Sequence, residues 1–238
     1  MRKAIILMLL LPIAGFGQLK GLLEKAAQKV TQSQSSGIDI SAGLKEALNR
    51  GVSEQVSKLT ATDGFYKNDA VKILMPAELQ KVDKTLRKMG MSKLADDGIR
   101  ALNRAAEDAV KEATPIFVSA IKNMSISDAK GILLGNDSAA TSYLQTATTT
   151  ALYSKFSPVV KQSIGKVGAD VIWNTLITKY NSLPLVSKVN PDITDYVTDK
   201  ALEGVFAMIA VEEKNIRNNL DARKTELLKK VFAIQDKK

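Results

Sequence analysis

Apolar residues recur at every third or fourth position through most of the chain, and this spacing strongly constrains the fold. One example is the series Leu44, Leu48, Val52, Val56 and Leu59. Such spacing places apolar side chains on one face of an α-helix, whereas a half-buried strand needs alternation at every second position. Alternating stretches of useful length do not occur in the sequence. The pattern therefore predicts an all-α protein with little or no β-sheet.

Start and stop signals divide this pattern into about nine or ten helices on short connections. Ser125 and Asp128 have the spacing of a capping box, and Ser157-Pro158 predicts a restart because proline is tolerated in a first turn. Asp221 is expected to cap the last helix. The longest helix is expected to be the one that ends near Asn218. Because no heptad pattern persists, we expect a compact orthogonal bundle rather than a coiled coil.

The first seventeen residues have the layout of a secretory signal peptide. Arg2 and Lys3 precede an apolar run at 4–14, and the small residues of Ala14–Gly17 precede Gln18. A helix that spans a bilayer needs about 20 apolar residues, so this run is too short. We expect export to the periplasm or cell envelope with residues 1–17 removed. An uncleaved N-terminal anchor is the alternative.

The rest of the chain is expected to form one folded unit after a short leader segment. Residues 18–37 read as an N-terminal helix and a polar, serine-rich linker. Residues 38–238 are expected to form a single all-helical domain, a size that one hydrophobic core can support. The longest later apolar run, Val205–Val211, is too short to cross a membrane. We therefore expect a soluble protein after signal cleavage.

Cysteine and histidine are both absent from the sequence. This excludes thiol nucleophiles, Ser-His-Asp relays, Cys or His zinc sites, disulfides and lipidation of a lipoprotein cysteine. We expect no metal, no cofactor and no assigned catalytic residue. The net charge of +9 is spread along a chain with only 5% aromatic residues, which is not typical of nucleic-acid binding. The most basic stretch, Arg223–Lys238, leaves attraction to an anionic surface open.

Two polar groups on expected helices are the candidate site residues. Asn103, Arg104 and Glu107 lie in an alanine-rich helix that a neighbouring helix can approach closely. A polar group that faces such a contact must be hydrogen-bonded, so it forms either a structural network or a ligand site.

The second group lies toward the end of the expected longest helix. Glu213 and Arg217 are four residues apart and can pair on one turn, with Glu212 beside them. This arrangement is either an ion pair on a helix face or a carboxylate held near a groove. A buried glutamate can act as a general acid because burial raises its pKa.

Several short strings appear in a fixed order along the chain. They are Gly43–Leu48 (GLKEAL), Asp63–Tyr66 (DGFY), Leu102–Glu107 (LNRAAE), Ala120–Leu133 (AIKNMSISDAKGIL), Ala139–Thr141 (AAT), Asp195–Phe206 (DYVTDKALEGVF), Glu212–Arg217 (EEKNIR) and Leu227–Phe232 (LLKKVF). Together they resemble the bacterial family called domain of unknown function 4197, over roughly residues 38–232. The resemblance implies an exported helical protein with no assigned activity, and it brings no catalytic residue.

Three functions remain open from the residues alone. The first is a non-enzymatic envelope protein that binds a small ligand, a lipid or a protein partner. The second is an envelope hydrolase or lyase that uses Glu107, Glu212 or Glu213 as a single carboxylate. The third is a membrane-surface module that uses the basic C-terminal helix. A polar cleft, an apolar cavity and a flat basic face would distinguish them, in that order.

Overall fold

A computed structural model of the chain describes residues 40–88, 90, 92–166, 168, 170–171, 173–174, 178, 181–182, 184–185, 188 and 192–237. The expected signal peptide at 1–17 and the expected helix and linker at 18–37 lie outside these residues. Over the described part the secondary structure consists of helices joined by turns and irregular segments, with no strand. The all-α prediction is therefore confirmed.

The described elements follow one another with short connections. A helix over residues 40–60 leads through turns and an irregular segment to the short 3-10 helix η1 (Ala77–Leu79). The α-helices that follow are α2 (Gln80–Lys88), α3 (Ser92–Val110), α4 (Ala113–Asn123), α5 (Ile126–Leu133), α6 (Ala139–Lys166), α8 (Ile193–Asn218) and α9 (Glu226–Phe232). The 3-10 helices η2 (Leu220–Ala222) and η3 (Gln235–Lys237) flank α9.

The expected nine or ten helices are too many. The described part contains seven α-helices with defined bounds, besides the helical residues 40–60. One cause is Ser157-Pro158, which does not restart the chain: α6 runs unbroken through Pro158. Pro158 is exposed, so water can hydrate the carbonyl group that its missing N–H leaves unpaired. With 28 residues, α6 is also longer than α8 with 26, which we expected to be the longest.

The helix caps agree with the sequence at one position and differ at another. Ser125 and Asp128 form the predicted capping box at the start of α5. Asp221 does not cap the last helix, because it lies within η2. Thr225 caps α9 instead, and its side chain accepts a hydrogen bond from the N–H of Leu228 at 3.1 Å. The tight turn of η2 places Thr225, with its extended backbone, at the true helix start.

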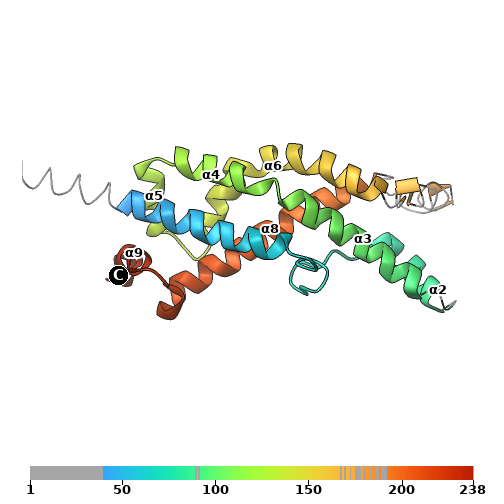
Figure 1. Cartoon of the computed structure of the whole chain (residues 1–238), viewed down its shortest axis with the longest axis horizontal. Coiled ribbons are helices and arrows are strands. Elements are labelled where there is room, and N and C mark those ends of the chain that lie inside the picture. Colours follow the sequence, from blue (N-terminus) through green and yellow to red (C-terminus); the bar gives the residue numbers. More distant parts are fainter. Residues whose placement is uncertain are drawn as a thin grey trace, which may run out of the picture.

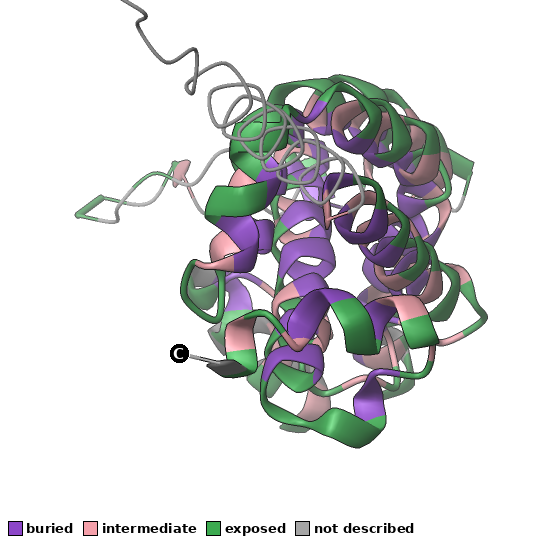
Figure 2. Ribbon diagram, turned by 90° about the vertical axis from the view of Figure 1, so that its left-hand side faces the viewer, coloured by how far each residue is buried: buried purple, intermediate pink, exposed green. Residues whose placement is uncertain are grey.

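Three long helices form the centre of the molecule. α3, α6 and α8 pack against one another, α4 and α5 pack on α6, and α2 packs on α3. In Figure 1 most of the long helices run along the length of the molecule, with α2 near one end and α9 and the C-terminus near the other. Figure 2 shows that these helices turn their buried residues inward and their exposed residues outward, as amphipathic helices do.

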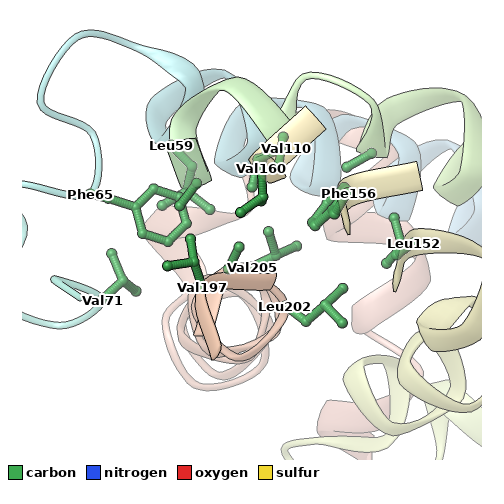
Figure 3. Packing of buried hydrophobic residues seen from close by; sticks show 14 of the residues in the cluster. Leu59, Phe65, Val71, Val110, Leu152, Phe156, Val160, Val197, Leu202 and Val205 are labelled. Carbon is green, nitrogen blue, oxygen red and sulfur yellow. The ribbon is translucent and has the colours of Figure 1, made fainter. Parts of the chain in front are cut away.

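The larger of two hydrophobic clusters fills the space between α3, α6 and α8. Phe65 is fully buried there and lies close to Val71 and Val197 (Figure 3). Its ring also contacts α8 at Gly204, where an added Cβ would lie only 2.6 Å from the Phe65 ring. Glycine at 204 therefore permits the turn segment after residue 60 to approach α8, and this approach forms the floor of a groove described below.

The second cluster lies at the end of the molecule that holds the C-terminus. It joins α5 and α9 to the beginning of the 40–60 helix through Leu44, Ile132, Val231 and Phe232. Among the described helices, none is both long and apolar enough to cross a membrane.

Candidate functional site

Asn103 on α3 holds the irregular segment that follows the 40–60 helix. Its Oδ1 accepts a hydrogen bond from the N–H of Ile73 at 2.9 Å, and its Nδ2 donates to the Ile73 carbonyl at 2.8 Å. Nδ2 also donates to the carbonyl of Ile99, one turn earlier on the same helix, at 2.8 Å. Asn103 is fully buried. Its amide thus satisfies both polar groups of one buried residue, as a neighbouring strand would.

Glu107 and Arg104, also on α3, fasten the turn just before that segment. Glu107 Oε1 accepts the N–H of Phe65 at 3.1 Å, and Oε2 accepts from Arg104. The same guanidinium donates to Asp63 at 2.6 Å. Asp63 also pairs with Lys67, and this hydrogen bond lowers the pKa of Asp63. Both oxygens of Glu107 are therefore occupied by donors from the chain.

Glu213 on α8 binds the first turn of α6. One of its carboxylate oxygens accepts the N–H of Ala140 at 2.8 Å, and the other accepts the N–H and the hydroxyl of Thr141 at 2.8 and 2.7 Å. The backbone N–H groups of a first helical turn have no partner within the helix, and a carboxylate is also favoured there by the helix dipole. Glu213 acts as a cap supplied by a helix that is distant in sequence.

Arg217 completes this junction on the next turn of α8. It is buried and donates to Glu213 at 2.8 and 3.0 Å. It also donates to the carbonyls of Ile132 and Leu133 at the end of α5, at 2.7 and 3.3 Å, and to Gln235 at 3.0 Å. The end of α5 and the start of α6 are thus joined to α8 by one ion pair. Within the described residues no hydrogen bond or ion pair connects this junction to the Asn103, Arg104 and Glu107 group.

Glu212 lies on another face of α8 and takes no part in the junction. Its Oε2 accepts a hydrogen bond from Gln55 at 3.2 Å. It borders a cavity of about 30 Å³ whose walls are mostly apolar. A space of this size corresponds to roughly one water molecule. Glu212 therefore has no room beside it, at this cavity, for a substrate.

These contacts argue against proton transfer by the candidate carboxylates. A general acid must release its proton to a bound substrate within hydrogen-bond reach. Glu107 and Glu213 are buried, and each accepts several hydrogen bonds that favour the ionised form. Their arrangement suits the joining of chain segments.

The basic C-terminal stretch also has an internal role. Arg223 is 3% exposed and donates to the carbonyls of Ile216 and Arg217, each at 3.0 Å, and to Asp236. Its guanidinium stacks over the ring of Phe232, with 5.5 Å between the guanidinium carbon and the ring centroid. Arg223 is therefore withdrawn from any interaction with an anionic surface.

The main hollow of the described structure is a groove of about 860 Å³ along the N-terminal half of α8. One wall is the segment 70–77, which Asn103 holds in place, and the other is the face of α8 from Asp192 to Ala207. The hydroxyl of Tyr196 bridges the walls by donating to the Leu74 carbonyl at 2.9 Å. This volume falls in the range of sites that hold small molecules or short peptides.

Acidic residues follow one another along the α8 wall of the groove. Asp192, Asp195, Asp199 and Glu203 all line it. Asp192 caps α8 by accepting the N–H of Thr194 at 2.9 Å. The other three, at intervals of four residues, form a row that we call the acidic row. Successive members lie about 6 Å apart along the helix axis.

The acidic row is only partly neutralised by its neighbours. Lys200 pairs with Glu203 at 2.6 Å, and Tyr153 on α6 donates its hydroxyl to Asp195. That hydrogen bond raises the pKa of Tyr153 to about 12. The pKa of Asp199 is raised as well, first by burial and then by the negative charges of Asp195 and Glu203. The direction of this shift shows that negative charge outweighs positive charge around Asp199.

Trp173 lines the same groove and carries an unpaired donor. It is 5% exposed, and its indole Nε1 is buried without a hydrogen-bond partner among the described residues. Buried polar groups are normally hydrogen-bonded, so an orphaned donor beside a groove needs a physical explanation. An acceptor carried by a bound molecule would supply one.

The carboxylates of the groove are not arranged around a point. Within the described part of the chain, no group of three or more acidic residues is placed to hold a metal ion. The acidic row instead extends along α8, and the groove therefore suits an elongated, positively charged molecule better than an ion.

Sequence reasoning placed its candidates on the correct helices but missed the groove. The signal in the sequence was the spacing of Asp195, Asp199 and Glu203 on one helical face. Such a row ordinarily indicates a solvated helix surface. Only the fold shows that segment 70–77 and Trp173 lie opposite it.

Comparison with known proteins places the chain within one family. A family model described as "Protein of unknown function (DUF4197)" matches residues 34–233. Neither a curated protein nor a solved structure matches the chain.

Proposed function

Since the chain belongs to the DUF4197 family of proteins of unknown function, we propose that it is a non-enzymatic binding protein of the cell envelope. Its binding site is the groove between segment 70–77 and α8. The observation that carries this proposal is the 860 Å³ groove itself, which has charged, aromatic and apolar walls.

The contacts of the candidate carboxylates support binding over catalysis. Glu107 and Glu213 are each bonded to backbone N–H groups and to an arginine. Glu212 faces a cavity of about 30 Å³. Each of these residues is thereby removed from the groove, which none of them lines. A hydrolase or lyase that uses one of them is accordingly the weaker alternative.

The membrane-surface alternative has less support as well. Arg223 is buried, Lys229 pairs with Glu226 at 2.8 Å, and Lys224 lies 3.9 Å from Glu54. The basic C-terminal stretch therefore presents fewer free cations than its sequence suggests. Without a concentrated basic face, attraction to anionic lipid is weak.

Export forms the cellular part of the proposal. The basic residues Arg2 and Lys3, the apolar run at 4–14 and the small residues before Gln18 support removal of residues 1–17. Mass spectrometry of the protein from its own envelope fraction is expected to find Gln18 at the N-terminus. An intact Met1 in that fraction would favour the anchored alternative.

Native mass spectrometry of the same preparation tests the binding function. We expect a retained ligand that is lost when the groove is blocked, for example by Gly204→Phe or, more gently, Ala207→Trp. Ala207 is exposed and lines the groove, so its replacement leaves the core intact. Consumption of a substrate by the purified protein, abolished by Glu107→Gln or Glu213→Gln in a folded variant, would overturn the proposal.

A further inference from the structure

The acidic row has a spacing that matches an extended polypeptide. Asp195, Asp199 and Glu203 follow each other at about 6 Å along α8. Alternate side chains of an extended chain point to the same side and lie about 6.6 Å apart. Three basic side chains at alternate positions of a peptide can therefore each face one carboxylate of the row. A compact cation would occupy only one of these positions.

The opposite wall has the properties of a surface that accepts an extended chain. Ile73 turns both of its backbone polar groups to Asn103. In an extended segment the next residue turns its polar groups to the other side. The Leu74 carbonyl does so, since it accepts from Tyr196 across the groove. Leu74 is also 53% exposed, so it offers apolar surface to a peptide side chain.

Trp173 supplies the donor that a peptide backbone would satisfy. Its Nε1 is buried, lies beside the groove and has no partner in the described part of the chain. Peptide carbonyls are strong acceptors and recur along an extended chain. Free polyamines lack such an acceptor, so this donor favours a peptide over a small cation.

We infer that the groove binds an extended polypeptide segment with lysine or arginine at alternate positions. The basic side chains pair with Asp195, Asp199 and Glu203, and a backbone carbonyl accepts the Trp173 Nε1–H. This inference rests on the proposed function, because it names the class of partner for the same groove.

The sequence contains a single tryptophan, so its fluorescence reports on the groove directly. The probe is the acetylated and amidated peptide Ala-Lys-Ala-Lys-Ala-Lys-Ala, titrated into the full chain at low ionic strength. We expect it to bind, to shift the Trp173 emission, and to bind more weakly as salt screens the charges. The counterpart with glutamate in place of lysine is expected not to bind.

Variants assign the binding to the acidic row. The double variant Asp199→Asn, Glu203→Gln is expected to weaken binding by about fourfold to twenty-fivefold, which corresponds to two partly exposed ion pairs. Glu46→Gln, which removes an exposed carboxylate from the 40–60 helix, is the matched control and should leave the affinity unchanged. Both positions of the double variant are exposed, so the protein should remain folded.

Two results would overturn the inference. One is equal affinity of the double variant and the original chain for the lysine peptide, and the other is binding of the glutamate peptide as tight as that of the lysine peptide. If a different retained ligand, such as a lipid, shifts the Trp173 emission while the lysine peptide does not, the peptide inference fails and the proposed function stands. If neither the envelope protein nor the titrations show any ligand, both fail.

Discussion

Asn103 binds both backbone polar groups of Ile73, thirty residues earlier in the chain, through its side-chain amide. Ile73 is 2% exposed, so water cannot replace these bonds. One buried side chain therefore positions the segment that forms a wall of the groove.

Replacement of this amide should destabilise the protein. Asn103→Ala leaves the N–H and the carbonyl of Ile73 buried without partners, and we expect a loss of about 2–4 kcal/mol in the free energy of unfolding. Urea denaturation measures this loss. Asn215→Ala, at an exposed position on α8, is the control and should change stability by less than about 0.5 kcal/mol. Equal stability of the two variants would show that Asn103 does not hold the segment.

Glu213 and its neighbour Glu212 should respond very differently to the same change. Glu213→Gln leaves the buried charge of Arg217 without its partner, and we expect it to lower the free energy of unfolding by about 3–5 kcal/mol. Glu212→Gln alters one partly exposed hydrogen bond to Gln55 and should cost less than about 1 kcal/mol. Thermal and urea unfolding of both variants provide the comparison. Similar losses in the two would contradict the assigned roles.

The hydrogen bond from Tyr153 to Asp195 predicts a loss of stability in alkali. The folded-state pKa of Tyr153 is raised to about 12, above its ordinary value of 10.0. Its contribution is therefore complete below pH 10 and disappears as the pH rises through 12. We expect Tyr153→Phe to be less stable at neutral pH by about 1 kcal/mol, a difference that vanishes at high pH. A difference that is independent of pH would refute this assignment.

Asp199 should show the opposite relation between charge and stability. Its folded-state pKa is raised above the ordinary value of 3.8, first by burial and then by Asp195 and Glu203. The ionised form is thus disfavoured on folding, and this penalty is present at neutral pH and vanishes below pH 3.8. We expect Asp199→Asn to raise the melting temperature at pH 7 and to have no effect at acidic pH. A lower melting temperature at pH 7 would contradict the shift.

A stabilising Asp199→Asn would also agree with a binding role. Binding sites often retain charges that lower stability, because those charges interact with the partner and not with the protein. The same variant is expected to weaken the lysine peptide, so stability and affinity should change in opposite directions.

The periodic pattern of apolar residues was sufficient to determine that the chain is helical. It also located the capping box of Ser125 and Asp128, because that motif acts within one turn. Local signals failed at Pro158, where packing of the buried face of α6 outweighs the loss of one hydrogen bond on the exposed face. They failed at Asp221 because the turn of η2 moved the helix start to Thr225.

The six candidate polar residues were visible in the sequence, whereas their partners were not. Helical spacing predicts the pair of Glu213 and Arg217, since both lie on one turn. It does not predict that Glu213 caps α6 or that Asn103 binds Ile73, because these contacts join segments 72 and 30 residues apart. The sequence by itself determined the helices and which residues can be polar on their buried faces. The tertiary structure alone decided what each polar group binds and where the groove lies, since both depend on the packing of distant segments.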